Sequence, residues 1–102
     1  MSSATLTASN DGVLAISGEF GYATASDLLT QGQALMGTHN KELTIDLSGV
    51  TGSDSAGLAL MLEWIDRYRT AGQQLHFLNV PESLLEIARV SNLIDLLPLA
   101  DT

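Results

Sequence analysis

Apolar and polar residues alternate in several short runs of this chain, and alternation with a period of two favours β-strands. Residues 4–8 and 13–17 are two such runs, and they flank Asn10-Asp11-Gly12. Because this tripeptide is a strong turn signal, a β-hairpin is predicted. Residues 42–47 show the clearest alternation in the chain, and residues 75–80 form another apolar run. The pattern therefore predicts four strands.

Apolar residues at helical spacing predict three helices between and after these strands. Thr24 or Ser26 suits the cap of the first helix, which ends at Gly37. The second helix runs over residues 54–70, and the third over residues 81–92, with Pro81 at its first position. Each helix thus follows a predicted strand.

Glycine and serine residues mark the breaks between these elements. Residues 18–21 are predicted to form a loop, and the strand at 42–47 is predicted to break at Ser48-Gly49. The apolar tail at 93–99 is short, so it is predicted as a last helical turn packed on the sheet. The element order predicts one α/β domain over residues 1–102, with a core at about 4–99 and a small mixed sheet covered by helices.

The second helix is more apolar than a helix with one buried face requires. At 100° per residue its apolar residues cover about 200°, whereas a core-facing stripe needs roughly 100°. These residues are Gly57, Leu58, Leu60, Met61, Leu62, Trp64, Ile65 and Tyr68. Met61 and Ile65 lie near the middle of the arc and are predicted to face the sheet. Leu60 and Trp64, on the margin towards Ser55, are interpreted as a partner surface, whereas Leu62 on the other margin suits core and partner equally.

Charge narrows the classes of partner. The chain of 102 residues carries 12 acidic and 4 basic residues, a formal net charge of −8, and it contains no cysteine. So few basic residues disfavour nucleic acid and anionic membrane surfaces as partners. The sequence has no stretch typical of a signal peptide or a transmembrane helix, so direct membrane insertion is not expected.

The sequence shows no clear pattern of residues for a catalytic or metal-binding site. His39 and His76 have no ligand partners at metal-binding spacing, so no metal site is predicted. Asp46 alternates outward on a strand, whereas Asp54 suits a helix cap, so the two are not expected to act as a carboxylate pair. Ser55 has no histidine base nearby in sequence, and the glycines around it form no nucleotide-binding motif. The expectation is a protein that is no enzyme and needs no cofactor.

Ser55 at a helix N-terminus has two interpretations that the residues alone leave open. A phosphate on this serine would be stabilised by the helix dipole and the exposed N–H groups, which would make Ser55 a switch. Alternatively, Ser55 is a first-turn serine that satisfies backbone donors. Both interpretations place a polar side chain at the surface.

The strand at 43–47 with the following Asp54-Ser55-Ala56-Gly57-Leu58 resembles the core signature of STAS domains, the fold of anti-sigma-factor antagonists. The resemblance covers nearly the whole chain and implies an anti-sigma-factor-antagonist-like fold. In the anti-sigma antagonists, the serine or threonine after the aspartate is phosphorylated by a partner kinase. The resemblance thus marks Ser55 as a phosphorylation site in one alternative, a partner-switching regulator.

Residues 57–64 (GLALMLEW), 77–81 (FLNVP) and 87–91 (IARVS) resemble more narrowly the stand-alone STAS subunit of the Mla system. That resemblance implies a cytoplasmic subunit bound to the ATPase of an inner-membrane ABC transporter of phospholipids, and through the ATPase to its permease. It implies a partner-binding segment at 54–57, Asp54 to Gly57. Leu60 and Trp64 are added to this surface from the helical arc alone. The oligomeric state of the isolated chain is left open, because a surface that awaits a partner can also pair with itself.

Overall fold

The computed structural model describes residues 3–8, 12–36 and 42–100 of the chain. The predicted turn at Asn10-Asp11, the predicted helix end at Gly37 and the side chain of His39 lie outside these residues. Along the described chain the elements are β1 (Ala4–Ala8), β2 (Val13–Phe20), α1 (Ala25–Met36), β3 (Glu42–Ser53), α2 (Ser55–Thr70), β4 (Gln74–Leu78), α3 (Glu82–Val90) and the short 3-10 helix η1 (Ile94–Leu96). The predicted order of strands and helices is confirmed.

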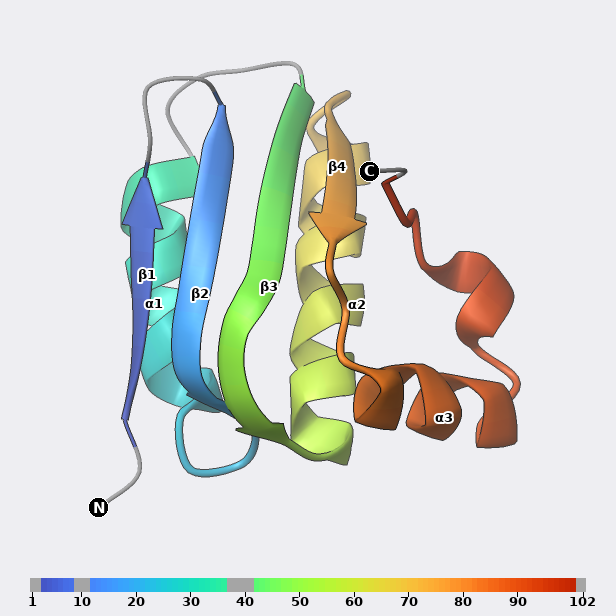
Figure 1. Cartoon of the computed structure of the whole chain (residues 1–102). Helices are drawn as coiled ribbons and strands as arrows, with labels where there is room; N and C mark the ends of the chain where they lie inside the picture. The colour runs from blue at the N-terminus through green and yellow to red at the C-terminus, as the bar shows by residue number, and fades with distance from the viewer. Residues whose placement is uncertain (1–2, 9–11, 37–41, 101–102) are drawn as a thin grey trace.

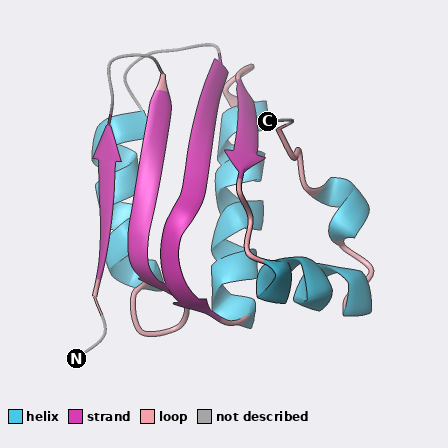
Figure 2. Cartoon of the chain, viewed as in Figure 1, coloured by secondary structure: helices cyan, strands magenta, loops and turns pink. Residues whose placement is uncertain are grey.

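The four strands form one mixed sheet in the order β1-β2-β3-β4 (Figure 1). β1 pairs antiparallel with β2, whereas β2 with β3 and β3 with β4 are parallel, as the predicted helical crossovers require. Helices α1 and α2 lie together on one face of the sheet, and α3 lies beyond the end of β4 (Figures 1 and 2). Across the described ranges, no helix is both long enough and apolar enough to cross a membrane.

Two strands are longer than predicted, and glycine explains why. β2 continues through the predicted loop to Phe20, and β3 continues past Ser48-Gly49 to Ser53. Gly49 lies opposite Ser17, where the register between β2 and β3 shifts. A Cβ atom added at Gly49 would lie 2.9 Å from the Cβ of Ser17, so only glycine allows the strands to approach this closely. The predicted break is therefore an irregularity within one long strand.

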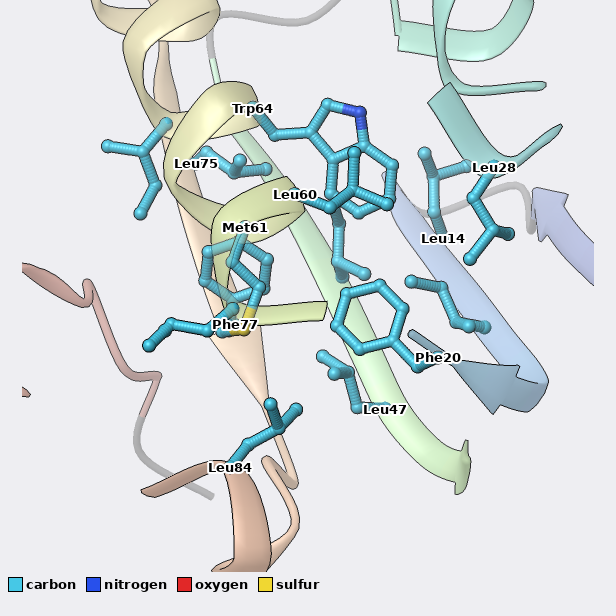
Figure 3. Close-up of a cluster of buried hydrophobic side chains, with 14 of the residues drawn as sticks. Leu14, Phe20, Leu28, Leu47, Leu60, Met61, Trp64, Leu75, Phe77 and Leu84 are labelled. Carbon is cyan, nitrogen blue, oxygen red and sulfur yellow. The ribbon is translucent and has the colours of Figure 1, made fainter. Parts of the chain in front are cut away.

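The core lies between the sheet and the two helices that cover it (Figure 3). The alternation predicted for β3 is confirmed, because Leu43, Ile45 and Leu47 are all buried. The largest fully buried side chains come from every layer of the fold: Phe20, Phe77, Ile16, Leu28, Ile45, Leu47, Met61 and Leu84. One continuous core thus holds the sheet, both covering helices and the start of α3.

The C-terminal segment pairs with the outer edge of β4. After η1, Leu97 is buried and Leu99 forms a parallel bridge with Phe77. The Phe77 N–H donates to the Pro98 carbonyl at 2.9 Å, and the Ala100 N–H donates to the Phe77 carbonyl at 2.7 Å. The predicted helical turn in the tail is thus present as η1, and the residues after it extend along the sheet.

Candidate functional site

Asp54 caps the N-terminus of α2, as its sequence position predicts. Its backbone is extended, with φ −147°, and its Oδ1 accepts a hydrogen bond of 2.8 Å from the Ala56 N–H. This geometry satisfies one of the donors that the first helical turn leaves unpaired. Ser55 follows as the first residue of the helix, with its side chain exposed. The cap therefore fixes the backbone on which Ser55 is displayed.

The carboxylate of Asp54 also holds the loop between β2 and α1. Both of its oxygens accept from the Tyr22 N–H, each at 3.1 Å. A Cβ atom at Gly21 would lie 2.6 Å from this carboxylate, so the residue beside Tyr22 has to be glycine. The side chain of Tyr22 is left 86% exposed. One acidic side chain thus joins two segments that lie 32 residues apart in sequence.

No pattern in the sequence predicts that Tyr22 lies beside the N-terminus of α2. It lies in a turn rather than on a periodic helix or strand, and its link to Asp54 runs through its backbone. An exposed aromatic side chain beside a helix terminus becomes visible only once the fold brings the two segments together. Aromatic residues in such positions are common anchors of protein interfaces.

Ser53 directly precedes the capping Asp54, and its side chain is joined to Ser83. The two serine Oγ atoms lie 3.0 Å apart and share a hydrogen bond that joins the end of β3 to the first turn of α3. We define the α2 N-terminal surface as Tyr22, Ser53, Asp54, Ser55 and Ser83. It presents three hydroxyl groups and one phenol, and its single carboxylate already accepts backbone N–H groups.

Gly57 is buried, although the sequence placed it in the partner-binding segment. A Cβ atom there would lie 2.4 Å from the Phe20 carbonyl oxygen, so glycine lets the first turn of α2 rest against the end of β2. Ala56 is half-buried. Gly57 therefore positions the helix terminus and adds no exposed contact, whereas Ser55 and Asp54 reach the surface.

Leu60 and Trp64 are core residues, and their interpretation as an exposed partner margin is corrected. Leu60 is 5% exposed and Trp64 is 2% exposed. The ring of Trp64 stacks on Phe20 of β2 with centroids 6.2 Å apart, and α1 approaches from the other side (Figure 3). The wide apolar arc is thus covered by the sheet and by α1. On the opposite margin Leu62 is half-buried and packs against the core.

The one histidine within the described residues does not lie beside Ser55. His76 lies in β4 beside Ile65 and Arg69, in the C-terminal half of α2, whereas Ser55 begins that helix. Over the ranges that the structure describes, no three His, Cys, Asp or Glu side chains are grouped to hold a metal ion. The groups that the α2 N-terminal surface exposes are hydroxyls and a phenol, which form hydrogen bonds.

Asp46 accepts hydrogen bonds from residues other than those that bond to Asp54. Its Oδ1 accepts from the Asn79 side chain at 3.0 Å and from the Ser48 N–H at 2.9 Å. The hydrogen bond from Asn79 is the main cause that lowers the pKa of Asp46 below its ordinary value of 3.8; partial burial opposes it and Ser48 adds to it. Asp46 and Asp54 therefore have separate hydrogen-bond partners.

Comparisons with known proteins agree with this fold. The model of a protein family described as "Mlab, STAS domain" matches residues 3–98. A search of curated protein sequences found no significant match. Domains of the STAS family are in general binding and regulatory domains without catalysis.

Three solved structures share the fold at low sequence identity. The unphosphorylated anti-sigma factor antagonist SpoIIAA superposes with a TM-score of 0.69 at 15% identity, covering 96% of this chain and 88% of that chain. A candidate anti-sigma factor antagonist from Thermotoga maritima gives 0.76 at 16% identity, with 96% and 86% covered. An anti-sigma factor antagonist from Mycobacterium paratuberculosis gives 0.69 at 21% identity, with 97% and 86% covered. With the family model spanning nearly the whole chain, this protein belongs to the MlaB STAS-domain family.

Proposed function

We propose that this protein is a non-catalytic accessory subunit that binds the cytoplasmic ATPase of an inner-membrane ABC transporter and supports its assembly and activity. The transporter moves phospholipids between the two membranes of a diderm cell and so maintains the lipid asymmetry of the outer membrane. The observation that carries this proposal is the family match over residues 3–98, whose description names MlaB. The protein reaches the membrane only through the ATPase and its permease partner.

The α2 N-terminal surface suits the ATPase contact. Its backbone is held rigid by the carboxylate of Asp54, so few degrees of freedom are lost on binding. Tyr22 supplies a large exposed aromatic group, and Ser55 supplies an exposed hydroxyl.

A second candidate function is that of an anti-sigma factor antagonist controlled by phosphorylation of Ser55. The observation that favours it is the exposed position of Ser55 in the first turn of α2. A phosphate there gains from the helix dipole and places up to two negative charges on the contact surface. Such a change would release a bound partner without unfolding the domain.

Purification of the tagged protein from solubilised membranes distinguishes the two functions. Under the first, an ABC ATPase and its permease are recovered with the protein in a fixed ratio. Recovery of a soluble kinase-like protein instead, together with a phosphate on Ser55 in the mass spectrum, contradicts the first function and supports the second.

Substitution of Ser55 by Asp tests the surface itself. We expect Ser55→Asp to weaken binding of the ATPase by about tenfold, because the added charge is desolvated at the interface. The fold should stay intact, since an acidic residue is favourable in the first turn of a helix. Binding is measured by calorimetry with purified ATPase, and folding by circular dichroism.

Ser26→Asp is the matched control for Ser55→Asp. Ser26 is also exposed in the first turn of a helix, α1, and lies outside the α2 N-terminal surface. It should bind the ATPase like the unmodified chain. If Ser55→Asp, Ser26→Asp and the unmodified chain all bind the ATPase with equal affinity, Ser55 does not lie in the interface.

A further inference from the structure

A pocket of about 250 Å³ lies between α1 and α2, at the end of α2 opposite Ser55. Its walls include Gly32 and Gln33 of α1, Trp64, Arg67 and Tyr68 of α2, and Ala71 just after the helix. The pocket is smaller than typical sites for drug-sized ligands, so it suits a molecule of few atoms. It shares no residue with the α2 N-terminal surface.

Trp64, which lines this pocket, carries a buried hydrogen-bond donor that has no partner. Its indole Nε1 is buried and has no hydrogen-bond partner, and it is the one such side-chain atom found in the part of the chain that the structure describes. Buried donors are nearly always paired, so an unpaired one requires an explanation. In Figure 3 the nitrogen lies on the edge of the ring nearer α1, the helix that forms the other wall of the pocket. An acceptor that enters from the pocket would pair it.

Arg67 sets the charge of the same wall. Its Nε donates to the Glu63 carboxylate at 2.6 Å. The guanidinium group carries five N–H donors, so its terminal amino groups can still face a ligand. None of the residues that line the pocket is acidic, although the whole chain carries a net charge of −8. Arg67 is thus the one charged residue that lines the pocket, and its ion pair with Glu63 leaves its terminal amino groups as donors.

We propose that this pocket binds a small monocarboxylate with an apolar body. The carboxylate accepts hydrogen bonds from Trp64 Nε1 and from the Arg67 guanidinium group, a charge-assisted pairing. The apolar body lies against the ring of Tyr68 and over Gly32, which has no side chain to fill the space. Because Nε1 is closed to solvent in the free chain, the ligand reaches it as side chains at the mouth of the pocket rearrange.

The fluorescence of Trp64 provides a direct test, because Trp64 is the sole tryptophan of the chain. Hexanoate is titrated into the full-length protein while the emission is recorded. For so small a ligand we expect a saturable change with a dissociation constant on the order of a millimolar. Hexylammonium, which matches hexanoate in size and carries the opposite charge, should cause no saturable change. An absent hexanoate response, or an equal response to hexylammonium, overturns the proposal.

Two surface variants locate the binding to this pocket. Arg67→Gln should weaken hexanoate binding by about tenfold, because the charged partner is lost. Arg69→Gln is the control on the same helix, since Arg69 lies beside His76 and not in this pocket. Ala71→Leu places a larger side chain at the exposed rim and should also weaken binding. Unchanged affinity in both Arg67→Gln and Ala71→Leu contradicts the proposal.

Trp64→Phe tests the indole N–H itself, with calorimetry in place of fluorescence. The variant keeps an aromatic ring in the core and removes the donor, so we expect hexanoate binding to weaken by about tenfold or more. Circular dichroism checks the fold. Should this core variant fail to fold, the Arg67→Gln and Ala71→Leu measurements still decide the proposal.

Discussion

Close backbone approach makes glycine necessary at residue 57. The first turn of α2 passes so near the end of β2 that a Cβ atom at this position would lie 2.4 Å from the Phe20 carbonyl oxygen and 2.9 Å from its ring. Glycine is otherwise a poor residue within a helix, by about 1 kcal/mol relative to alanine. Its presence is therefore a requirement of packing, and it fixes where Ser55 is displayed.

We predict that Gly57→Ala lowers the free energy of unfolding by up to about 2 kcal/mol. Overpacking against backbone costs about 1–3 kcal/mol, and the better helix propensity of alanine offsets about 1 kcal/mol of it. Urea unfolding measures the change. Ala59→Gly, at an exposed position of the same helix, is the control, and it should cost about 1 kcal/mol through propensity alone. A Gly57→Ala variant that is more stable than the unmodified chain would contradict the close approach.

The hydrogen bond from Asn79 to Asp46 makes stability depend on pH. The folded chain lowers the pKa of Asp46 below 3.8, so its carboxylate is favoured in the folded state. This stabilisation is fully present above the unfolded pKa, and it is lost as the pH falls through the folded pKa. We predict that the difference in unfolding free energy between the unmodified chain and Asn79→Gly shrinks as the pH is lowered from 7 through that range.

Glycine is the suitable replacement at residue 79, because Asn79 has a φ of 58°, a conformation that glycine adopts without strain. Any effect of Asn79→Gly on the flexibility of the unfolded chain is independent of pH. Asp46→Asn, which removes the titrating group, should abolish the same part of the pH dependence. A constant difference between the unmodified chain and Asn79→Gly at every pH would exclude this hydrogen bond as the cause.

In helix α2, the apolar pattern predicted the residues that face the sheet but not the residues that a second helix covers. The arc correctly placed Met61 and Ile65 against the sheet, since both are buried. The pattern of a single helix carries no information on what lies beside it, and α1 covers the margin where Leu60 and Trp64 lie. An apolar arc wider than one stripe therefore indicated a second covering element of the same chain.

We predict that Leu60→Ala lowers the free energy of unfolding by about 2–4 kcal/mol, because truncation leaves a cavity in the core. Leu62→Ala removes the same atoms from the half-buried margin and should cost clearly less. Thermal or urea unfolding compares the two variants. If both variants lose little unfolding free energy and by nearly equal amounts, Leu60 is not a core residue and its interpretation as a partner contact stands.

In strand β3, the sequence predicted the first half of the strand but not the second. Its alternating half, Leu43 to Leu47, was predicted because each buried side chain is visible in the sequence. Its second half contains Ser48, Gly49 and Gly52, which favour a turn when read locally. Pairing with β2 overrides that preference, because the small residues permit the register shifts between the strands.

Across the whole molecule, local features of the site were predictable and distant ones were not. The cap at Asp54 and the exposed serine after it follow from adjacent residues in the sequence. Tyr22 and Ser83 join them from other parts of the chain, through hydrogen bonds to Asp54 and Ser53 that depend on the sheet order. The parallel direction of the later strands was predicted, because helical crossovers join parallel strands, whereas the order of the strands was not.

The sheet as a whole has two edges, and the C-terminal segment covers one of them. Residues 97–100 run along β4 with two backbone hydrogen bonds to Phe77, and Leu97 lies in the core. An exposed strand edge offers unpaired N–H and C=O groups to other chains. We therefore predict that deletion of residues 97–102 both lowers the free energy of unfolding and promotes self-association, measured by urea unfolding and by light scattering after gel filtration.

Leu97→Ala separates the two effects of that deletion. It removes a buried side chain, at a cost of about 2–4 kcal/mol, and keeps the backbone that pairs with Phe77. If edge protection is the cause of self-association, the truncated chain forms larger species at concentrations where Leu97→Ala stays monomeric, although both are destabilised. Equal self-association of the two variants would instead assign the effect to lost core packing, because both then expose the same apolar surface on partial unfolding.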